Sequence, residues 1–228
     1  CKYENYSNEG YRIWNIADGM TYLYTDDRSQ YTNGFWATVD PRRLPGTTSE
    51  YILRQNCASD REAGKTPYNW AGGADLGIYG VAGVQMQALG STLAVDSAVS
   101  KKSWFMFDDE IVALGAGITN SGMDLPVETT VENRRLGENA DNTFLVDGEE
   151  TNLPIKEAKL TELLDRRADV SGTSFENVKW AHLEGSESAG TGYYFPSDGT
   201  EIQARRARTT GNWSDIGTSE GESTQDYL

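Results

Sequence analysis

The sequence "KSWFMFDDEIVALGAGIT" at residues 102–119 decides the fold class of this chain. Two apolar runs, Trp104–Phe107 and Ile111–Leu114, flank three consecutive acidic residues at 108–110. Two apolar segments on either side of a short polar turn are typical of a β-hairpin. We therefore predict two antiparallel strands here, joined at the acidic turn.

Similar short segments lie on both sides of this hairpin, and many of them are separated by glycine. The chain contains 24 glycines, and the segments between them are rich in Val, Ile, Tyr, Phe, Trp and Thr, which favour strands. The other expected strands lie at residues 19–25, 75–89, 127–136, 142–153, 177–185, 191–199 and 200–209, and the segment 142–153 is expected to turn at Asp147-Gly148. Strands at this regular spacing predict an all-β fold, a large antiparallel β-sandwich.

One segment has a different pattern. "IKEAKLTELLDRRADV" at residues 155–170 is rich in helix formers and places Leu160, Leu163 and Leu164 on roughly one face. It indicates one short helix near 155–168, inserted between strands, although the pattern alone leaves this open. No repeat of 20–50 residues and no Pro- or Ser-rich linker divides the chain, so we expect a single domain over residues 1–228.

The composition excludes several classes of protein. A chain of 228 residues with 37% hydrophobic content is typical of a folded globular protein, and no apolar run is long enough to span a membrane. The net charge is −15, from 35 acidic and 20 basic residues, whereas nucleic-acid binding needs clustered cations. Nucleic acid is therefore not an expected partner. Two cysteines, Cys1 and Cys57, allow at most one disulfide, which the sequence leaves open.

Familiar catalytic motifs are missing from the sequence. The chain has one histidine, His182, inside a predicted strand, and it has no G-x-S-x-G motif, phosphate-binding loop or dinucleotide-binding loop. A zinc site needs several His or Cys ligands, so we expect neither a metal site nor a cofactor. Carboxylates are plentiful, and an acid pair of the glycosidase type stays open.

The stretch "YENYSNEGYRIWNIADGMTYLYTDDRSQYTNGFWATVDPRRLPGTTSE" at residues 3–50 contains six tyrosines and two tryptophans but few aliphatic residues. Such side chains combine flat amphipathic faces with hydrogen-bonding groups, which suits sugars and also suits a half-exposed sandwich edge. Within it, "FWATVDPRRLPGTT" predicts a structural crossing, in which Pro41 and Pro45 fix turns, Gly46 permits a tight bend and Trp36 packs.

As a unit, this stretch resembles polysaccharide lyase family 8, which includes the hyaluronate, chondroitin AC and xanthan lyases. The matching blocks are Tyr3-Glu4, Trp14, Asp18-Gly19-Met20, Tyr22-Leu23-Tyr24, Phe35-Trp36, Thr38-Val39-Asp40-Pro41 and Leu44-Pro45-Gly46-Thr47-Thr48. Downstream, "KSWFMFDDEIVALGAGI", "VETTVENRR", "GYYFP" and "TTGNWSDI" also look like blocks of the family. The resemblance covers most of the chain, and residues 155–170 are the main part that does not match.

The resemblance implies the central sandwich, a supersandwich like that of galactose mutarotase, of a secreted bacterial enzyme. Family members pair it with an N-terminal α/α toroidal domain, which this sequence lacks. They cleave acidic, uronate-containing polysaccharides of the hyaluronan, chondroitin or xanthan type by β-elimination. The Tyr, His, Asn and Arg that perform the chemistry belong to the helical domain, so this chain alone is expected to be inactive.

The resemblance also implies site residues. A glutamate of the family's Tyr-Glu pair corresponds to Glu4, which would hold the catalytic Arg and Tyr by hydrogen bonds, and Asn5 and Asn8 are candidate sugar contacts. The family usually has Asn-x-Glu-Asn next, where this chain has "SNEG" at residues 7–10. Because an acidic chain repels an acidic polymer, we expect the helical domain, helped by Arg42 and Arg43, to make the cleft basic.

Two other interpretations remain open at this stage. One is a non-catalytic carbohydrate-binding or scaffolding sandwich, and the weaker one is a sugar-ring isomerase on a similar fold. The coding sequence upstream of Cys1 distinguishes the lyase from the binding module, because only the lyase needs a helical region there with an Asn, His and Tyr set.

Overall fold

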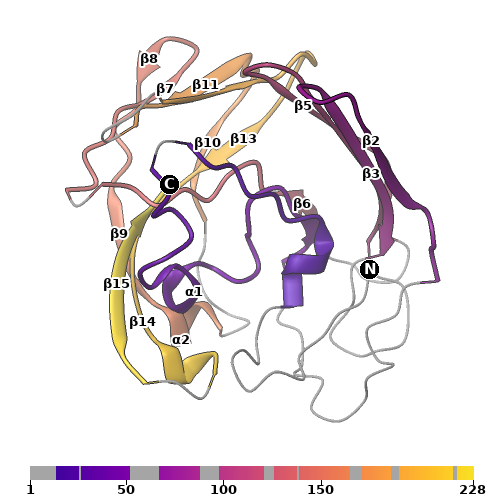
Figure 1. The fold of residues 1–228 in the computed structure, drawn as a ribbon. Coiled ribbons are helices and arrows are strands. Elements are labelled where there is room, and N and C mark those ends of the chain that lie inside the picture. The colour runs from indigo at the N-terminus through magenta and orange to yellow at the C-terminus, as the bar shows by residue number, and fades with distance from the viewer. Residues whose placement is uncertain are drawn as a thin grey trace. The chain divides into compact units, whose positions relative to one another are not determined.

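The computed structural model describes residues 14–25, 27–51, 67–87, 98–120, 126–137, 139–164, 171–185, 190–217 and 220–228. The chain forms two compact units: the first consists of residues 1–21 and 41–131, and the second of residues 22–40 and 132–228. The chain therefore passes between the units three times. The prediction of a single domain stays a prediction, and each unit is described separately with the labels of Figure 1.

The first unit is built around a four-stranded antiparallel sheet in the order β2-β3-β4-β5 (Figure 1). A second, two-stranded sheet pairs β1 with β6. The elements of this unit are η1 (Trp14–Asp18), β1 (Thr48–Glu50), β2 (Ala71–Asp75), β3 (Gly80–Gln87), β4 (Val99–Met106), β5 (Ile111–Thr119) and β6 (Val127–Thr129).

The hairpin predicted at residues 102–119 is confirmed. β4 and β5 pair antiparallel with Met106 opposite Ile111, and the Phe107 N–H donates to the Glu110 carbonyl at 2.9 Å across the acidic turn. The predicted strand region 75–89 contains the end of β2 and the whole of β3, which are separated by a turn at residues 76–79. Local alternation and turn chemistry were sufficient here because each strand pairs with its neighbour in sequence.

The bend predicted at Gly46 is also present. Gly46 has φ +79°, a left-handed conformation, and its N–H donates to the Thr130 carbonyl at 2.8 Å. A Cβ at this position would lie 2.5 Å from Thr21 Oγ1. Both the backbone conformation and the close approach therefore require glycine.

The second unit contains the remaining elements. They are α1 (Phe35–Thr38), β7 (Phe144–Val146), β8 (Glu149–Glu150), β9 (Ile155–Lys159), α2 (Leu160–Leu163), β10 (Thr173–Phe175), β11 (Trp180–Leu183), β12 (Thr191–Tyr194), β13 (Ile202–Ala204), β14 (Arg206–Asn212), η2 (Trp213–Asp215) and β15 (Glu222–Tyr227). Three sheets result, in the orders β12-β11-β7-β8, β15-β14-β9 and β10-β13.

The region in which a helix was predicted, near 155–168, is described as far as residue 164. Within 155–164, residues Ile155–Lys159 form β9, which pairs with β14 in parallel, and only Leu160–Leu163 are helical (Figure 1). The helix propensity of residues 155–159 is overridden by pairing with a strand about 50 residues downstream. Leu160 and Leu163 are buried, as the leucine pattern indicated.

The segment 19–25 is not a strand, contrary to its alternating pattern. The Leu23 N–H donates to the Tyr31 hydroxyl at 2.9 Å instead of to another strand.

The helix α1 was not expected from the sequence. It packs directly on β14, where a Cβ on Gly211 would lie 1.8 Å from the Ala37 carbonyl oxygen. The absence of a side chain at Gly211 is therefore what permits this approach.

One hydrophobic cluster of the second unit includes buried residues of β7 and β11. Its buried members are Leu136, Ala140, Phe144, Val146, Leu153, Val178, Ala181 and Leu183. The predicted turn at Asp147-Gly148 joins β7 to β8, with φ +49° and +91° at these two residues. The all-β fold class is thus confirmed, and within the described ranges no helix is long and apolar enough to cross a membrane.

Candidate functional site

The three predicted site residues, Glu4, Asn5 and Asn8, lie outside the described residues, as do Cys1 and Cys57. Their roles therefore stay predictions. The polar groups that the structure does place must be assessed on their own geometry.

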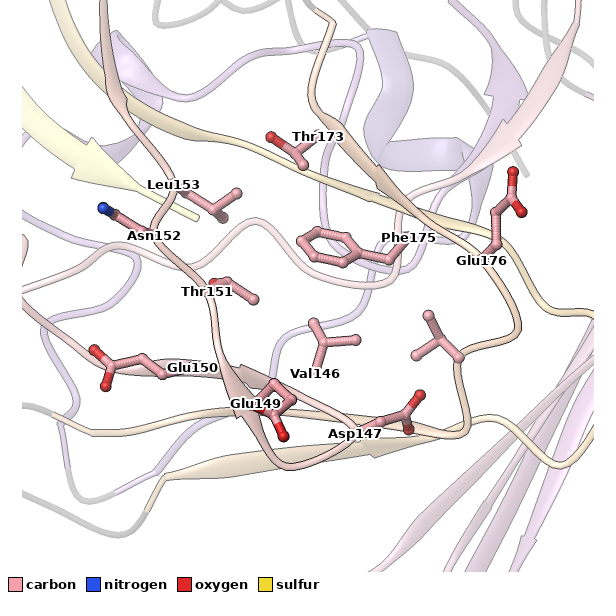
Figure 2. A pocket seen from close by; sticks show the side chains of 11 residues that line it. Val146, Asp147, Glu149, Glu150, Thr151, Asn152, Leu153, Thr173, Phe175 and Glu176 are labelled. Carbon is pink, nitrogen blue, oxygen red and sulfur yellow. The ribbon is translucent and has the colours of Figure 1, made fainter.

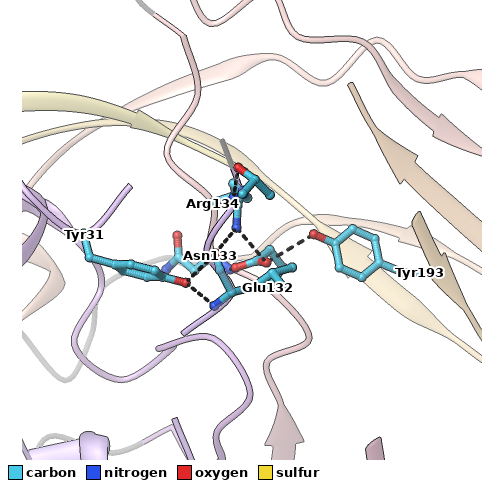
Figure 3. Close-up of polar contacts among 7 residues, drawn as sticks. Tyr31, Glu132, Asn133, Arg134 and Tyr193 are labelled. Carbon is cyan, nitrogen blue, oxygen red and sulfur yellow. Dashed lines mark hydrogen bonds and ion pairs between the residues drawn. The ribbon is translucent and has the colours of Figure 1, made fainter. Parts of the chain in front are cut away.

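A connected group of polar side chains in the second unit is centred on Glu132 (Figure 3). Tyr193 Oη donates to Glu132 Oε2 at 3.3 Å, and Arg134 Nη1 lies 3.7 Å from the same oxygen. The Asn133 N–H donates to Glu132 Oε1 at 3.0 Å. The side chains of Glu132 and Arg134 are only 11% and 9% exposed, so this ion pair is largely shielded from solvent.

Arg134 links this pair to the aromatic-rich segment. Its Nη1 donates to the Leu23 carbonyl at 3.1 Å, and its Nη2 donates to Thr25 Oγ1 at 3.2 Å. Since the Leu23 N–H also donates to the Tyr31 hydroxyl, both polar groups of Leu23 are held by side chains. The network therefore fixes the backbone at residues 22–25 without any strand pairing.

Burial determines the protonation of the network. It raises the pKa of the Glu132 carboxyl group, an effect that Arg134 opposes. Burial likewise raises the pKa of Tyr193 above that of a free tyrosine and raises the pKa of Tyr31 to about 12. A tyrosine that acts as a base near neutrality needs a lowered pKa, so these two phenols are expected to stay protonated. The described hydrogen bonds of the network hold the backbone of residues 22–25.

The aromatic side chains of residues 22–36 divide into a packed and an exposed set. Tyr31 and Phe35 are buried, with ring centroids 5.2 Å apart in an edge-to-face arrangement. Tyr22 and Tyr24 contact Tyr31 edge-on at 5.0 Å and 5.2 Å but remain 43% and 60% exposed. Trp36 contacts Phe35, in agreement with its predicted packing role.

A pocket of about 310 Å³ lies elsewhere in the second unit (Figure 2). Apolar side chains, among them Phe175, line it together with carboxylates, and Phe175 lies between Glu150 and Glu176 in this view. The lining residues are Val146, Asp147, Glu149, Glu150, Thr151, Asn152, Leu153, Thr173, Phe175, Glu176 and Val178. With four carboxylates and no basic side chain, this pocket would repel an acidic polysaccharide.

Arg42 and Arg43 do not supply the free positive charge that the sequence predicted. Both guanidinium groups lie against the Tyr51 ring, at 3.8 Å and 4.4 Å from its centroid, and Arg42 is 2% exposed. Arg43 also forms a bidentate pair with Glu128, at 3.0 Å and 2.9 Å. Arg42 is buried and the Arg43 side chain is 23% exposed, so both cations are held by partners within the first unit.

The first unit also buries a lysine. Lys102 is 6% exposed; its ammonium group donates to the Gly46 carbonyl and lies 5.6 Å from the centroid of the Trp104 ring. Burial lowers the pKa of Lys102 to about 8, although the nearby Asp18 acts in the opposite direction. Asp18 in turn accepts a hydrogen bond from Asn15 at 3.0 Å.

Among the described residues, no group of three or more His, Cys, Asp or Glu side chains is placed to hold a metal ion. His182 lies in β11, opposite Leu145 and Gly192, in the sheet position that the sequence indicated.

The fold is that of an all-β domain. Its described polar groups hold backbone segments in place, and the described residues do not form a complete catalytic set. The family model for the super-sandwich domain of polysaccharide lyase family 8 matches residues 1–228. The chain therefore belongs to polysaccharide lyase family 8. The resemblance seen in the sequence is thereby confirmed. Glu132, Arg134 and Tyr193 were not singled out as site residues, although the blocks "VETTVENRR" and "GYYFP" contain them.

Individual relatives agree with this assignment. The chain is 38% identical over 220 residues to a hyaluronate lyase of Thermasporomyces composti, a match to 94% of this chain and 24% of the relative. It is 36% identical over 216 residues to a xanthan lyase of Bacillus sp. (strain GL1), covering 94% and 20% of the two chains. The chain thus spans about a fifth to a quarter of the length of these relatives.

Solved structures show the same fold. The chain superposes on a Paenibacillus xanthan lyase with a TM-score of 0.77 and 34% identity, covering 99% of this chain and 20% of that one. A chondroitin AC lyase of Streptomyces coelicolor A3, a Y253A mutant, gives a TM-score of 0.68 and 30% identity, with coverage of 97% and 25%.

Proposed function

We propose that the polypeptide containing this chain cleaves uronate-containing polysaccharides by β-elimination and that this chain forms the sandwich side of the carbohydrate cleft. The observation that carries the proposal is the family match over all 228 residues. The names of the relatives, hyaluronate, xanthan and chondroitin AC lyase, indicate the class of polymer.

The proposed reaction makes two demands. A base removes the proton on the carbon next to the uronate carboxyl group while that carboxylate is neutralised, because negative charge develops on it. The bond from the neighbouring carbon to the glycosidic oxygen then breaks, a proton passes to this oxygen, and a carbon–carbon double bond remains in the sugar. We assign the base and acid to a helical domain N-terminal to this chain.

The titration of the described tyrosines supports this division of roles. Wherever the pKa of a described tyrosine departs from that of free tyrosine, at Tyr22, Tyr31, Tyr193 and Tyr227, it is raised, with burial as the main cause. None of these four phenols is suited to accept a proton near neutrality. In our proposal this chain contributes Glu4, which orients the catalytic Arg and Tyr, while Asn5 and Asn8 contact the sugar. A substrate of polymer size further implies secretion of the enzyme.

The experiment is an assay of the whole polypeptide on hyaluronan, chondroitin and xanthan, in which unsaturated ends are measured by their ultraviolet absorbance. Glu4→Gln should lower kcat/KM by orders of magnitude on whichever polymer is cleaved. Glu110→Gln, which makes the same charge change at the exposed β4–β5 turn, should leave it unchanged. Full turnover by the 228-residue chain alone, or an active Glu4→Gln enzyme, would overturn the proposed roles. If the whole polypeptide binds but cleaves none of the three polymers, the alternative of a binding module is favoured.

A further inference from the structure

The β12-β11-β7-β8 sheet of the second unit has two faces of different chemistry. In β11, Ala181 and Leu183 are buried members of the hydrophobic cluster, whereas Trp180 is 38% exposed and His182 is half-buried. Successive residues of a strand point to opposite faces of the sheet, so Trp180 and His182 lie on the face turned away from this cluster. We call it the outer face.

The outer face places a tryptophan beside a tyrosine. Trp180 in β11 is directly opposite Tyr194 in β12, and His182 is opposite Gly192. Directly opposite residues of an antiparallel pair lie on the same face, with Cβ atoms about 4.5–5.5 Å apart. Tyr194 is 74% exposed, and a Cβ at Gly192 would meet nothing within 4 Å. The outer face thus carries two exposed aromatic side chains with open space next to them.

Trp180 is held in place although its side chain is exposed. Its N–H donates to Asp147 Oδ1 at 2.9 Å, and its carbonyl accepts from the Asp147 N–H at 3.0 Å. The ring lies against the β7–β8 turn, since a Cβ at Gly148 would be 3.8 Å from Trp180 Cζ2. β11 is also paired on both sides, with β12 and with β7. A ligand that contacts this ring therefore loses little affinity to the ordering of the protein.

The residue types of the outer face indicate the class of ligand. Strands that are buried on both faces are rich in Val, Ile and Leu, and the exposed strand β5 has this composition. Trp180 and Tyr194 instead combine a flat apolar ring with an N–H or O–H group. A pyranose ring is amphipathic in the same way, because it has C–H bonds on its faces and hydroxyl groups at its edge.

The charges around the outer face favour an uncharged ring. Lys179, which precedes Trp180, is paired with Asp198 at 2.5 Å. β7, β11 and β12 contain no lysine or arginine, and β8 consists of Glu149 and Glu150. A uronate carboxylate finds no free cation in these strands, whereas a neutral sugar needs none.

We propose that the outer face binds an uncharged pyranose ring of the polymer, with Trp180 and Tyr194 against the face of the ring and the open position at Gly192 leaving room for it. The class of ligand rests on the proposed function. The site is built by described residues of the second unit alone. It holds the polymer and breaks no bond.

The test is calorimetric titration of the whole polypeptide with a hyaluronan hexasaccharide whose carboxyl groups have been reduced to alcohols. This probe consists of uncharged rings, and it is not cleaved because it lacks the carboxylate next to the proton that the reaction removes. We expect Trp180→Ala to weaken its binding about tenfold or more, and Tyr194→Ala about threefold or more. Trp70→Ala, which removes a 52% exposed tryptophan of the first unit, is the matched control and should bind like wild type.

A further variant tests the site without removing a contact of the fold. Gly192→Val adds a side chain at the open position, which should obstruct the sugar ring and weaken binding about tenfold. Since a β-branched residue favours a strand more than glycine does, the same variant should keep or raise the stability in urea denaturation. Gly72→Val makes the same change at another open strand position and should leave binding unchanged.

No binding of the reduced probe by wild type at millimolar concentration overturns the proposal, and so does wild-type affinity in Trp180→Ala or in Gly192→Val. The outer-face site and the proposed reaction fail separately. Cleavage of native hyaluronan without binding of the reduced probe refutes the outer-face site alone. Binding of the reduced probe that depends on Trp180, without cleavage of any of the three polymers, refutes the proposed reaction alone.

Discussion

Replacing Arg134 by methionine should be among the most destabilising single changes on the second unit. The substitution keeps an apolar stem but removes the hydrogen bonds to the Leu23 carbonyl and to Thr25, at 3.1 Å and 3.2 Å. It also leaves Glu132 without its cation, which lies 3.7 Å away in wild type. Removing one partner of a buried ion pair costs about 3–5 kcal/mol, and we expect a loss of unfolding free energy in this range.

A double-mutant cycle separates the ion pair from the rest. Glu132→Gln retains an acceptor for Tyr193, and Arg134 keeps its two other acceptors, so we expect this single change to cost about 1–2 kcal/mol. In the double variant neither charge is stranded, so its cost should fall short of the sum of the single changes by about 2 kcal/mol. Urea denaturation followed by circular dichroism measures all four free energies.

The pH dependence provides an independent check on this reasoning. In Arg134→Met, the pKa of Glu132 should rise further, because burial already raises it and Arg134 opposes that effect. A carboxyl group whose folded pKa exceeds its unfolded value destabilises the protein when ionised, and this penalty is relieved as the pH falls through the folded pKa. The variant should therefore be closer to wild type at pH 5 than at pH 8. A loss of unfolding free energy below about 1 kcal/mol in Arg134→Met would refute the interpretation of Glu132 and Arg134 as a coupled buried pair. Strictly additive losses in the double-mutant cycle would refute it as well.

Two further predictions concern close packing and titration. Gly211→Ala should cost about 3 kcal/mol in urea denaturation, because its Cβ would collide with the Ala37 carbonyl, whereas Gly72→Ala, with open space at its Cβ, should change stability by less than about 0.5 kcal/mol. Lys102 has a folded pKa of about 8, below its unfolded value, so the unfolded state binds more protons and stability rises with pH above 8. Relative to Lys102→Met, the wild-type unfolding free energy should rise by about 1–2 kcal/mol between pH 8 and 9.5. A difference in unfolding free energy that does not change with pH would contradict the burial of a charged amine.

The sequence predicted those parts of the fold that depend on neighbours along the chain. The β4–β5 hairpin and the Asp147-Gly148 turn join consecutive strands, so alternation and turn residues contained the necessary information. β9 was mistaken for helix because its partner β14 lies about 50 residues away, and pairing with a distant strand leaves no local signal. The segment 19–25 alternates like a strand, but the Tyr31 hydroxyl takes the place of a ladder partner.

The polar network around Glu132 could not be predicted from the sequence for the same reason. Glu132 and Tyr193 are separated by 61 residues, and Arg134 reaches Leu23 across 111. Composition and spacing cannot identify such partners, and family resemblance marked the blocks without assigning roles within them. Resemblance was nevertheless correct for the family itself, because several ordered blocks are far more specific than any single motif. Arg42 and Arg43 show the opposite error, since adjacent basic residues in a sequence do not imply an exposed basic patch.

β5 has one further consequence for anyone who handles this chain on its own. All nine of its residues, Ile111–Thr119, are solvent-exposed, none is charged and none is proline, and among the described strands only β4 lies beside it. Its outer backbone groups form a ready template on which a strand from another molecule can add. If no other segment covers this edge, strand addition should make the chain self-associate at high protein concentration. Such self-association would originate in β5 and would not indicate a defect in the folded core.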